Sequence, residues 1–120
     1  MQDVVCNASP LIFLAKIERL DLFDNYALHI PSQVESEILK GLKRKKEDAK
    51  RIIEYLEHKN LIPIKTVILK DLPDFLGAGE KAVISLAVRE KIEKVFIDEE
   101  KARTVARFKG LCPKGTLGIL

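Results

Sequence analysis

The stretch DVVCNASPLIFLAKI, residues 3–17, decides the fold because it places a strand directly before a helix. Residues 3–6 form a short apolar strand candidate, which Asn7-Ala8-Ser9-Pro10 ends. Ser9 suits the N-cap of a helix and Pro10 suits its first position. Apolar residues then recur at helical spacing. A strand followed by a helix is the repeating unit of an α/β fold.

The same alternation continues along the chain. Ser32 with Glu35 fits a capping box that opens a second helix, and residues 66–78 are expected to be irregular. The order predicts the α/β class, with a three-layer α/β/α, Rossmann-like architecture around a mainly parallel central sheet. Ligands bind in such folds beyond the carboxyl ends of the strands. Further strands are expected at 27–30, 61–65, 94–98 and 111–114, and helices at about 32–42, 46–58, 79–90 and 99–109.

Length and composition indicate one soluble domain, which we expect in the cytoplasm. Leu, Ile, Val and Phe supply 42 of the 120 residues, far more than in a disordered chain. No apolar stretch approaches the roughly 20 residues needed to span a bilayer, and the N-terminus does not resemble a signal peptide. The spacing of Cys6 and Cys112 does not fit a metal site, and we expect both to be buried free thiols. The absence of Trp and the abundance of Lys, Glu and Ile favour a thermophilic source.

The charge of the chain is unevenly distributed. The net charge is only +3, but residues 40–51 contain seven lysines and arginines against Glu47 and Asp48. Such a cluster suits a phosphate backbone, and it equally suits a solvated connection between two helices. The centre of the cluster gives the candidate RNA-binding residues Lys43, Arg44, Lys45 and Lys46.

Two acidic residues fall on or beside the apolar stripes of predicted helices. Glu80 lies at the centre of the stripe that Val83 and Ile84 continue, where an unpaired acid is costly. A first-turn glutamate favoured by the helix dipole is the simpler alternative. Glu37 lies at the edge of the stripe of its own helix, where a solvated flank explains it equally well.

Two further polar positions follow predicted strands. Asp98 ends the strand formed by residues 95–97, where ligands bind in such folds, and Glu99 comes next. Both also suit the start of the helix that follows. Asn7 ends the first strand, where it offers a neutral oxygen ligand or forms an Asx turn.

Together these residues form a candidate oxygen-ligand cluster. Several carboxylates in one place repel one another unless a hard cation such as Mg²⁺ or Mn²⁺ neutralises them. Such a cation activates water and stabilises charge on a phosphodiester. His29 and His58 have no partner at metal or triad spacing, and no Gly-rich phosphate loop is present. The cluster consists of Asn7, Glu37, Glu80, Asp98 and Glu99.

Five short motifs in a fixed order resemble the PIN-domain family. They point in particular to a PIN-like subfamily of poorly defined function, which is related to the VapC-type toxin nucleases of type II toxin–antitoxin pairs. The matching stretches are VVCNASPLI (4–12), IPSQV with Glu37-Ile38 (30–38), LGAGEKAV (76–83), IDEEKAR (97–103) and GTLGIL (115–120).

The resemblance implies a Rossmann-like sheet and an acidic pocket that binds Mg²⁺ or Mn²⁺ and hydrolyses RNA. It also implies a homodimer and a small antitoxin partner. Glu37, Glu80 and Asp98 match the catalytic acids, and Glu99 is the alternative to Asp98. Ser9 and Thr116 match small polar residues at the pocket rim.

Two departures from the family pattern bear on catalysis. Asn7 stands where the nucleases carry Asp, which removes one negative charge and should weaken metal binding. The chain also ends at GTLGIL, where relatives continue into another helix, so we expect a single domain without that last helix.

Three hypotheses follow from these residues. The first is a metal-dependent ribonuclease. The second is a catalytically weakened PIN-like module that binds RNA or a protein partner. The third is an unrelated Rossmann-like domain whose acids are all helix caps and solvated flanks.

Overall fold

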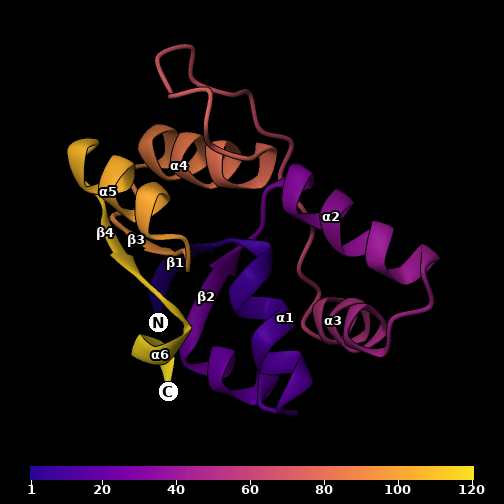
Figure 1. Ribbon diagram of the computed structural model, residues 1–120. Helices are drawn as coiled ribbons and strands as arrows, with labels where there is room; N and C mark the ends of the chain where they lie inside the picture. The colour runs from indigo at the N-terminus through magenta and orange to yellow at the C-terminus, as the bar shows by residue number, and fades with distance from the viewer.

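A four-stranded parallel sheet forms the centre of the computed structural model, which describes residues 1–120 (Figure 1). The strand order is β2-β1-β3-β4, and every neighbouring pair is parallel. In register, Val4 of β1 lies between Leu28 of β2 and Lys94 of β3. The strands are β1 (Gln2–Cys6), β2 (Tyr26–His29), β3 (Lys94–Phe96) and β4 (Cys112–Lys114).

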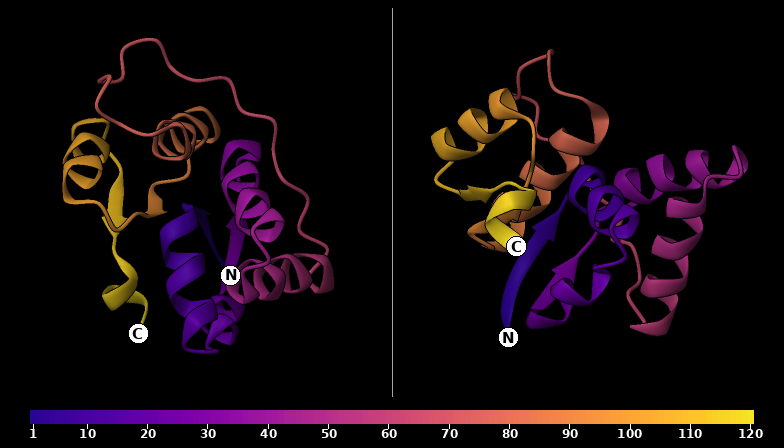
Figure 2. Two further views of the ribbon diagram at one scale, coloured as in Figure 1. Left: turned by 45° about the vertical axis from the view of Figure 1, so that its right-hand side comes forward. Right: turned by 60° about the horizontal axis from the view of Figure 1, so that its bottom comes forward.

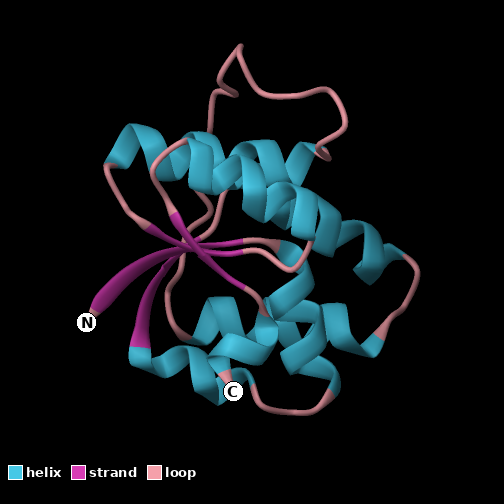
Figure 3. Cartoon of the chain, turned by 60° about the vertical axis from the view of Figure 1, so that its left-hand side comes forward, coloured by secondary structure: helices cyan, strands magenta, loops and turns pink.

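Helices cover both faces of the sheet, as Figure 3 shows with the strands seen nearly edge-on. The chain moves from β1 to β2 on one side and later returns past β1 to β3. Right-handed crossovers therefore place α1 on one face and α4 and α5 on the other. The helices are α1 (Ala8–Lys16), α2 (Ser32–Lys43), α3 (Glu47–His58), α4 (Ala78–Glu90), α5 (Glu100–Phe108), α6 (Thr116–Ile119) and the 3₁₀ helix η1 (Leu20–Asn25). The predicted three-layer α/β/α architecture is confirmed.

The predicted strand at 61–65 is wrong. Ile64 pairs only with the single position Pro31, outside the sheet. Pro31 and Pro63 have no backbone N–H, so a longer ladder cannot form there. Residues 61–77 instead run as a long connection from α3 to α4 (Figure 2). This connection is held by Gln33 Nε2, which donates to the Thr66 carbonyl at 2.7 Å, among other bonds.

The first helix begins earlier than predicted. Asn7, not Ser9, occupies its N-cap position, and α1 begins at Ala8. Pro10 is therefore the third helical residue. Proline is tolerated there because the first four N–H groups of a helix have no partner within it.

The predicted capping box of α2 is also wrong. Pro31 takes the N-cap position, and Ser32 already lies inside the helix. The Ser32 hydroxyl donates to Gln33 Oε1 at 3.3 Å and does not cap the backbone. Pro31 fixes an extended entry into the helix, which leaves Glu35 as a first-turn acid.

The core joins all three layers. Phe96 of β3 is fully buried, with its ring centroid 5.0 Å from that of Tyr26 and 6.1 Å from that of Phe23. Cys6 is buried as predicted, whereas Cys112 is exposed, which corrects that prediction. None of the helices combines the length and the apolar character that crossing a membrane requires.

Replacing Phe96 by alanine should destabilise the fold by about 3–5 kcal/mol, because it opens a cavity between two layers. Urea denaturation followed by circular dichroism measures the free energy of unfolding. Phe108→Ala is the matched control, since Phe108 is 87% exposed. Equal effects of the two substitutions would contradict the assignment of Phe96 to the core.

Candidate functional site

The site lies between β1 and β3, where the chain changes the side on which it adds the next strand. From β1 the chain crosses to β2 on one side, and from β3 it crosses to β4 on the other. A crevice for ligands forms beyond the carboxyl ends of two such strands. Asn7 follows β1 directly, and its N–H donates to the Phe96 carbonyl at the end of β3 at 3.0 Å. Asp98 follows two residues later, so the fold brings both polar residues to this edge.

Two side-chain oxygens converge on Gly79 in the first turn of α4. A Cβ atom at residue 79 would collide with Glu37 Oε1 and would lie 3.0 Å from Asn7 Oδ1. Glu37 comes from α2 and Asn7 from the end of β1, so three elements meet at this point. A side chain at residue 79 would displace the Glu37 carboxylate, which is the flexible end of its side chain.

The Asn7 side chain is buried and unsatisfied. Only 6% of the residue is exposed, and Oδ1 has no hydrogen-bond partner. A buried acceptor without a partner costs about 1–3 kcal/mol. An amide oxygen in this position suits a donor or a hard cation. Asn7 is therefore the strongest single indication of a binding site.

The Glu37 side chain is exposed as a whole, but its carboxylate is partly shielded where it meets Gly79. Loss of hydration raises the pKa of Glu37 above its ordinary value, and the charge of Glu80 raises it further. The Gly79 N–H and Lys40 act in the opposite direction on this pKa. A cation at the carboxylate would remove the cost of keeping it ionised.

Glu80 has a local structural role. Its Oε1 accepts a hydrogen bond from the Gly77 N–H at 2.9 Å, which caps the start of α4. The side chain is only partly buried. Glu80 thus makes the contact expected of a first-turn glutamate. Its negative charge also raises the pKa of Glu37.

Asp98 is engaged separately from Asn7 and Glu37. Its Oδ1 accepts from the Thr116 N–H at 2.6 Å, and the Thr116 hydroxyl lies 2.8 and 2.7 Å from its two oxygens. Arg103 Nη1 donates to the Asp98 carbonyl at 2.5 Å. Thr116 is thus a buried contact of Asp98 at the start of α6.

The other predicted residues are exposed, as Glu37 is, and lie away from Gly79. Glu99 caps α5 by accepting from the Lys101 N–H at 3.4 Å, so Glu99 and not Asp98 is the N-cap there. The Ser9 side chain makes no hydrogen bond. Lys43 ends α2, and Arg44, Lys45 and Lys46 form the turn into α3.

The predicted ligands are brought together only in part. No three Asp, Glu, His or Cys side chains lie close enough to hold a metal ion. Asn7 and Glu37 meet at Gly79 with Glu80 nearby, whereas Asp98 is bound to Thr116. One amide oxygen and one carboxylate fit part of the shell of a hard cation.

Gly79 is the site residue that the sequence motifs did not identify. Gly79 is the first residue of the predicted helix, where a glycine gives no strong signal of a close approach. The sequence therefore did not identify Glu37 and Asn7 as groups that meet there.

Replacing Gly79 by alanine should move the Glu37 carboxylate away from α4 and further into water. The pKa of Glu37 should then fall towards its ordinary value, since loss of hydration is the largest cause of its rise. The free energy of unfolding should change by no more than about 1 kcal/mol, because alanine favours the helix and the Glu37 side chain can move. NMR titration of the Glu37 carboxyl measures the shift. Gly118→Ala, at an exposed position of α6, is the control. An unchanged Glu37 pKa in Gly79→Ala would contradict the contact.

Comparison with known proteins supports the family that the motifs indicate. A family model described as PIN domain matches residues 3–120, which include all five motifs. No curated protein and no solved structure matches the chain. The match excludes an unrelated Rossmann-like domain. PIN domains are typically nucleases that act on RNA and usually use divalent metal ions. The chain belongs to the PIN-domain family.

Proposed function

We propose that this chain is a metal-dependent endoribonuclease. The observation that carries the proposal is the convergence of the unpartnered Asn7 Oδ1 and the Glu37 carboxylate on Gly79. This point lies beyond the carboxyl ends of β1 and β3. A buried orphan acceptor beside a carboxylate of raised pKa is an arrangement that a cation would stabilise.

In this proposal Asn7 and Glu37 hold Mg²⁺ or Mn²⁺. When bound, such a cation supplies an activated water and neutralises charge on a phosphodiester. Glu80 adds negative charge beside Glu37. Thr116 orients the Asp98 carboxylate, which is the further catalytic acid of the proposal. Glu99 is the alternative to Asp98, and Ser9 lies at the rim of the pocket.

The partners of the proposed nuclease follow from the resemblance to toxin nucleases. We propose RNA as the substrate, with Lys43, Arg44, Lys45 and Lys46 as candidate contacts to its backbone. A homodimer, a small antitoxin partner and a cytoplasmic location belong to the same proposal.

A second function deserves a test beside the first, because Asn7 removes a negative charge and no three acids converge. On this alternative the chain is a catalytically weakened PIN-like module that binds RNA or a protein partner. The alternative predicts binding without cleavage.

Replacing Glu37 by glutamine should lower RNA cleavage roughly 100-fold or more. Loss of a residue that only supports a metal ligand lowers activity about 10–100-fold, and loss of a charged ligand itself should lower it at least as much. Cleavage of a labelled RNA in Mn²⁺ or Mg²⁺, with an EDTA control, measures this loss. Glu35→Gln, on the same helix but away from Gly79, should retain activity. Wild-type protein that folds but does not cleave would favour the binding module.

Replacing Asn7 by aspartate should raise Mn²⁺ affinity about tenfold or more, because affinity for hard cations grows with ligand charge. Without metal the same change should lower the melting temperature, since it buries an unpaired charge. Thermal unfolding across a Mn²⁺ series measures both effects. Asn25→Asp, at an exposed position, should show neither. Unchanged Mn²⁺ affinity in Asn7→Asp would remove Asn7 from the proposed site.

A further inference from the structure

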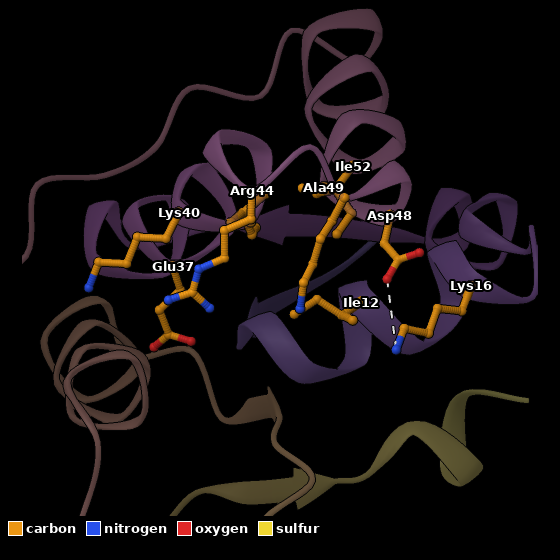
Figure 4. A pocket seen from close by; sticks show the side chains of 11 residues that line it. Ile12, Lys16, Glu37, Lys40, Arg44, Asp48, Ala49 and Ile52 are labelled. Atoms are coloured by element: carbon orange, nitrogen blue, oxygen red, sulfur yellow. Dashed lines mark ion pairs between the residues drawn. The ribbon is translucent and has the colours of Figure 1, made fainter.

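A cavity of about 250 Å³ lies between α1, α2 and α3 (Figure 4). Its apolar floor includes Ile12 of α1 and Ala49 and Ile52 of α3. Lys40, Arg44 and Lys46 line it from α2 and the turn that follows. These six residues define what we call the basic groove. It is a concave surface whose rim is cationic and whose floor is apolar.

The basic groove adjoins the candidate metal site. Glu37 lines the cavity, and the same carboxylate reaches Gly79. Lys40, one turn along α2 from Glu37, is close enough to act on its charge. A chain bound in the groove would therefore pass beside the convergence of Glu37 and Asn7.

The acids of the protein leave the cations of the groove without an ion pair, although Glu37 lies near Lys40. Lys40, Arg44 and Lys46 form no ion pair. Asp48, which also lines the cavity, is paired with Lys16 at 3.8 Å. Three unpaired cations around one concavity create a positive potential that attracts a polyanion.

We propose that the basic groove binds the phosphodiester backbone of one RNA strand beside the cleavage position. This inference rests on the proposed function, because it takes RNA as the substrate. It adds Lys40 to the candidate contacts and narrows those of the turn to Arg44 and Lys46. No aromatic side chain lines the groove, so bases do not stack there and binding is expected to depend on salt more than on sequence.

The test compares two triple variants of equal charge. The groove variant is K40Q/R44Q/K46Q. The control variant, K65Q/K70Q/R107Q, removes two lysines and one arginine that are exposed, unpaired and outside the groove. Fluorescence anisotropy of a labelled 12-nucleotide RNA, with EDTA present, measures binding without metal or cleavage. Urea denaturation checks that both variants fold.

The groove variant should lose roughly tenfold or more in RNA affinity at low salt. The slope of log affinity against log salt should become shallower by about 2, since each contact with a single strand contributes about 0.7. The control variant should change affinity less than about threefold, because distant surface charges are screened. Equal losses in the two variants would overturn the proposal.

Three further outcomes separate this proposal from its alternatives. A labelled 12-residue polyglutamate peptide that binds the groove more tightly than RNA would overturn it and indicate an acidic protein partner. Groove-dependent RNA binding without Mn²⁺-dependent cleavage would contradict the ribonuclease and leave the groove as an RNA site. If the groove variant retains full cleavage, the ribonuclease stands and the proposed RNA site in the groove is overturned.

Discussion

The parallel pairing of β1 with β3 is the contact on which the rest of the structure depends. Val4, Val5 and Cys6 are fully buried and lie between β2 and β3, so β1 is the centre of the sheet. Because the chain leaves these two strands in opposite directions, their carboxyl ends leave an edge that no crossover helix covers. The bond from the Asn7 N–H to the Phe96 carbonyl fixes Asn7 at that edge. The position of the candidate site thus follows from the same pairing that builds the core.

The polar residues at this edge differ in whether the protein satisfies them. Glu80 accepts from the Gly77 N–H, and the Asp98 carboxylate accepts from Thr116. Asn7 Oδ1 has no partner, and the pKa of Glu37 is raised because its carboxylate loses hydration. A buried acceptor without a partner is hard to explain by folding alone, since it lowers stability. Asn7, with the Glu37 carboxylate beside it at Gly79, is the place where a ligand would make the largest difference.

The sequence predicted the layers better than it predicted the contacts. Strand and helix alternation follows from local periodicity, so the sheet and the major helices were foreseeable. The start of α1 and the isolated pairing of Ile64 were not, because Asn7, Pro10 and Pro63 each fit more than one local structure. The meeting of Glu37 with Gly79 depends on how α2 packs against α4, about 40 residues later in the chain. Spacing marked Glu37 and Glu80 as unusual, but it could not show that Asp98 lies with Thr116 instead.

Asn7 and the basic groove have a joint consequence for the proposed nuclease. An amide in place of a carboxylate lowers the negative charge that holds a cation. Lys40 adds positive charge beside Glu37, which disfavours a metal ion in the same place. RNA bound in the groove would neutralise Lys40, Arg44 and Lys46 and would thereby raise the affinity of the site for metal. Linkage then requires that metal also strengthens RNA binding, by the same factor. In the proposed nuclease the metal site is therefore weak without RNA, and the bound polyanion would complete its electrostatic balance.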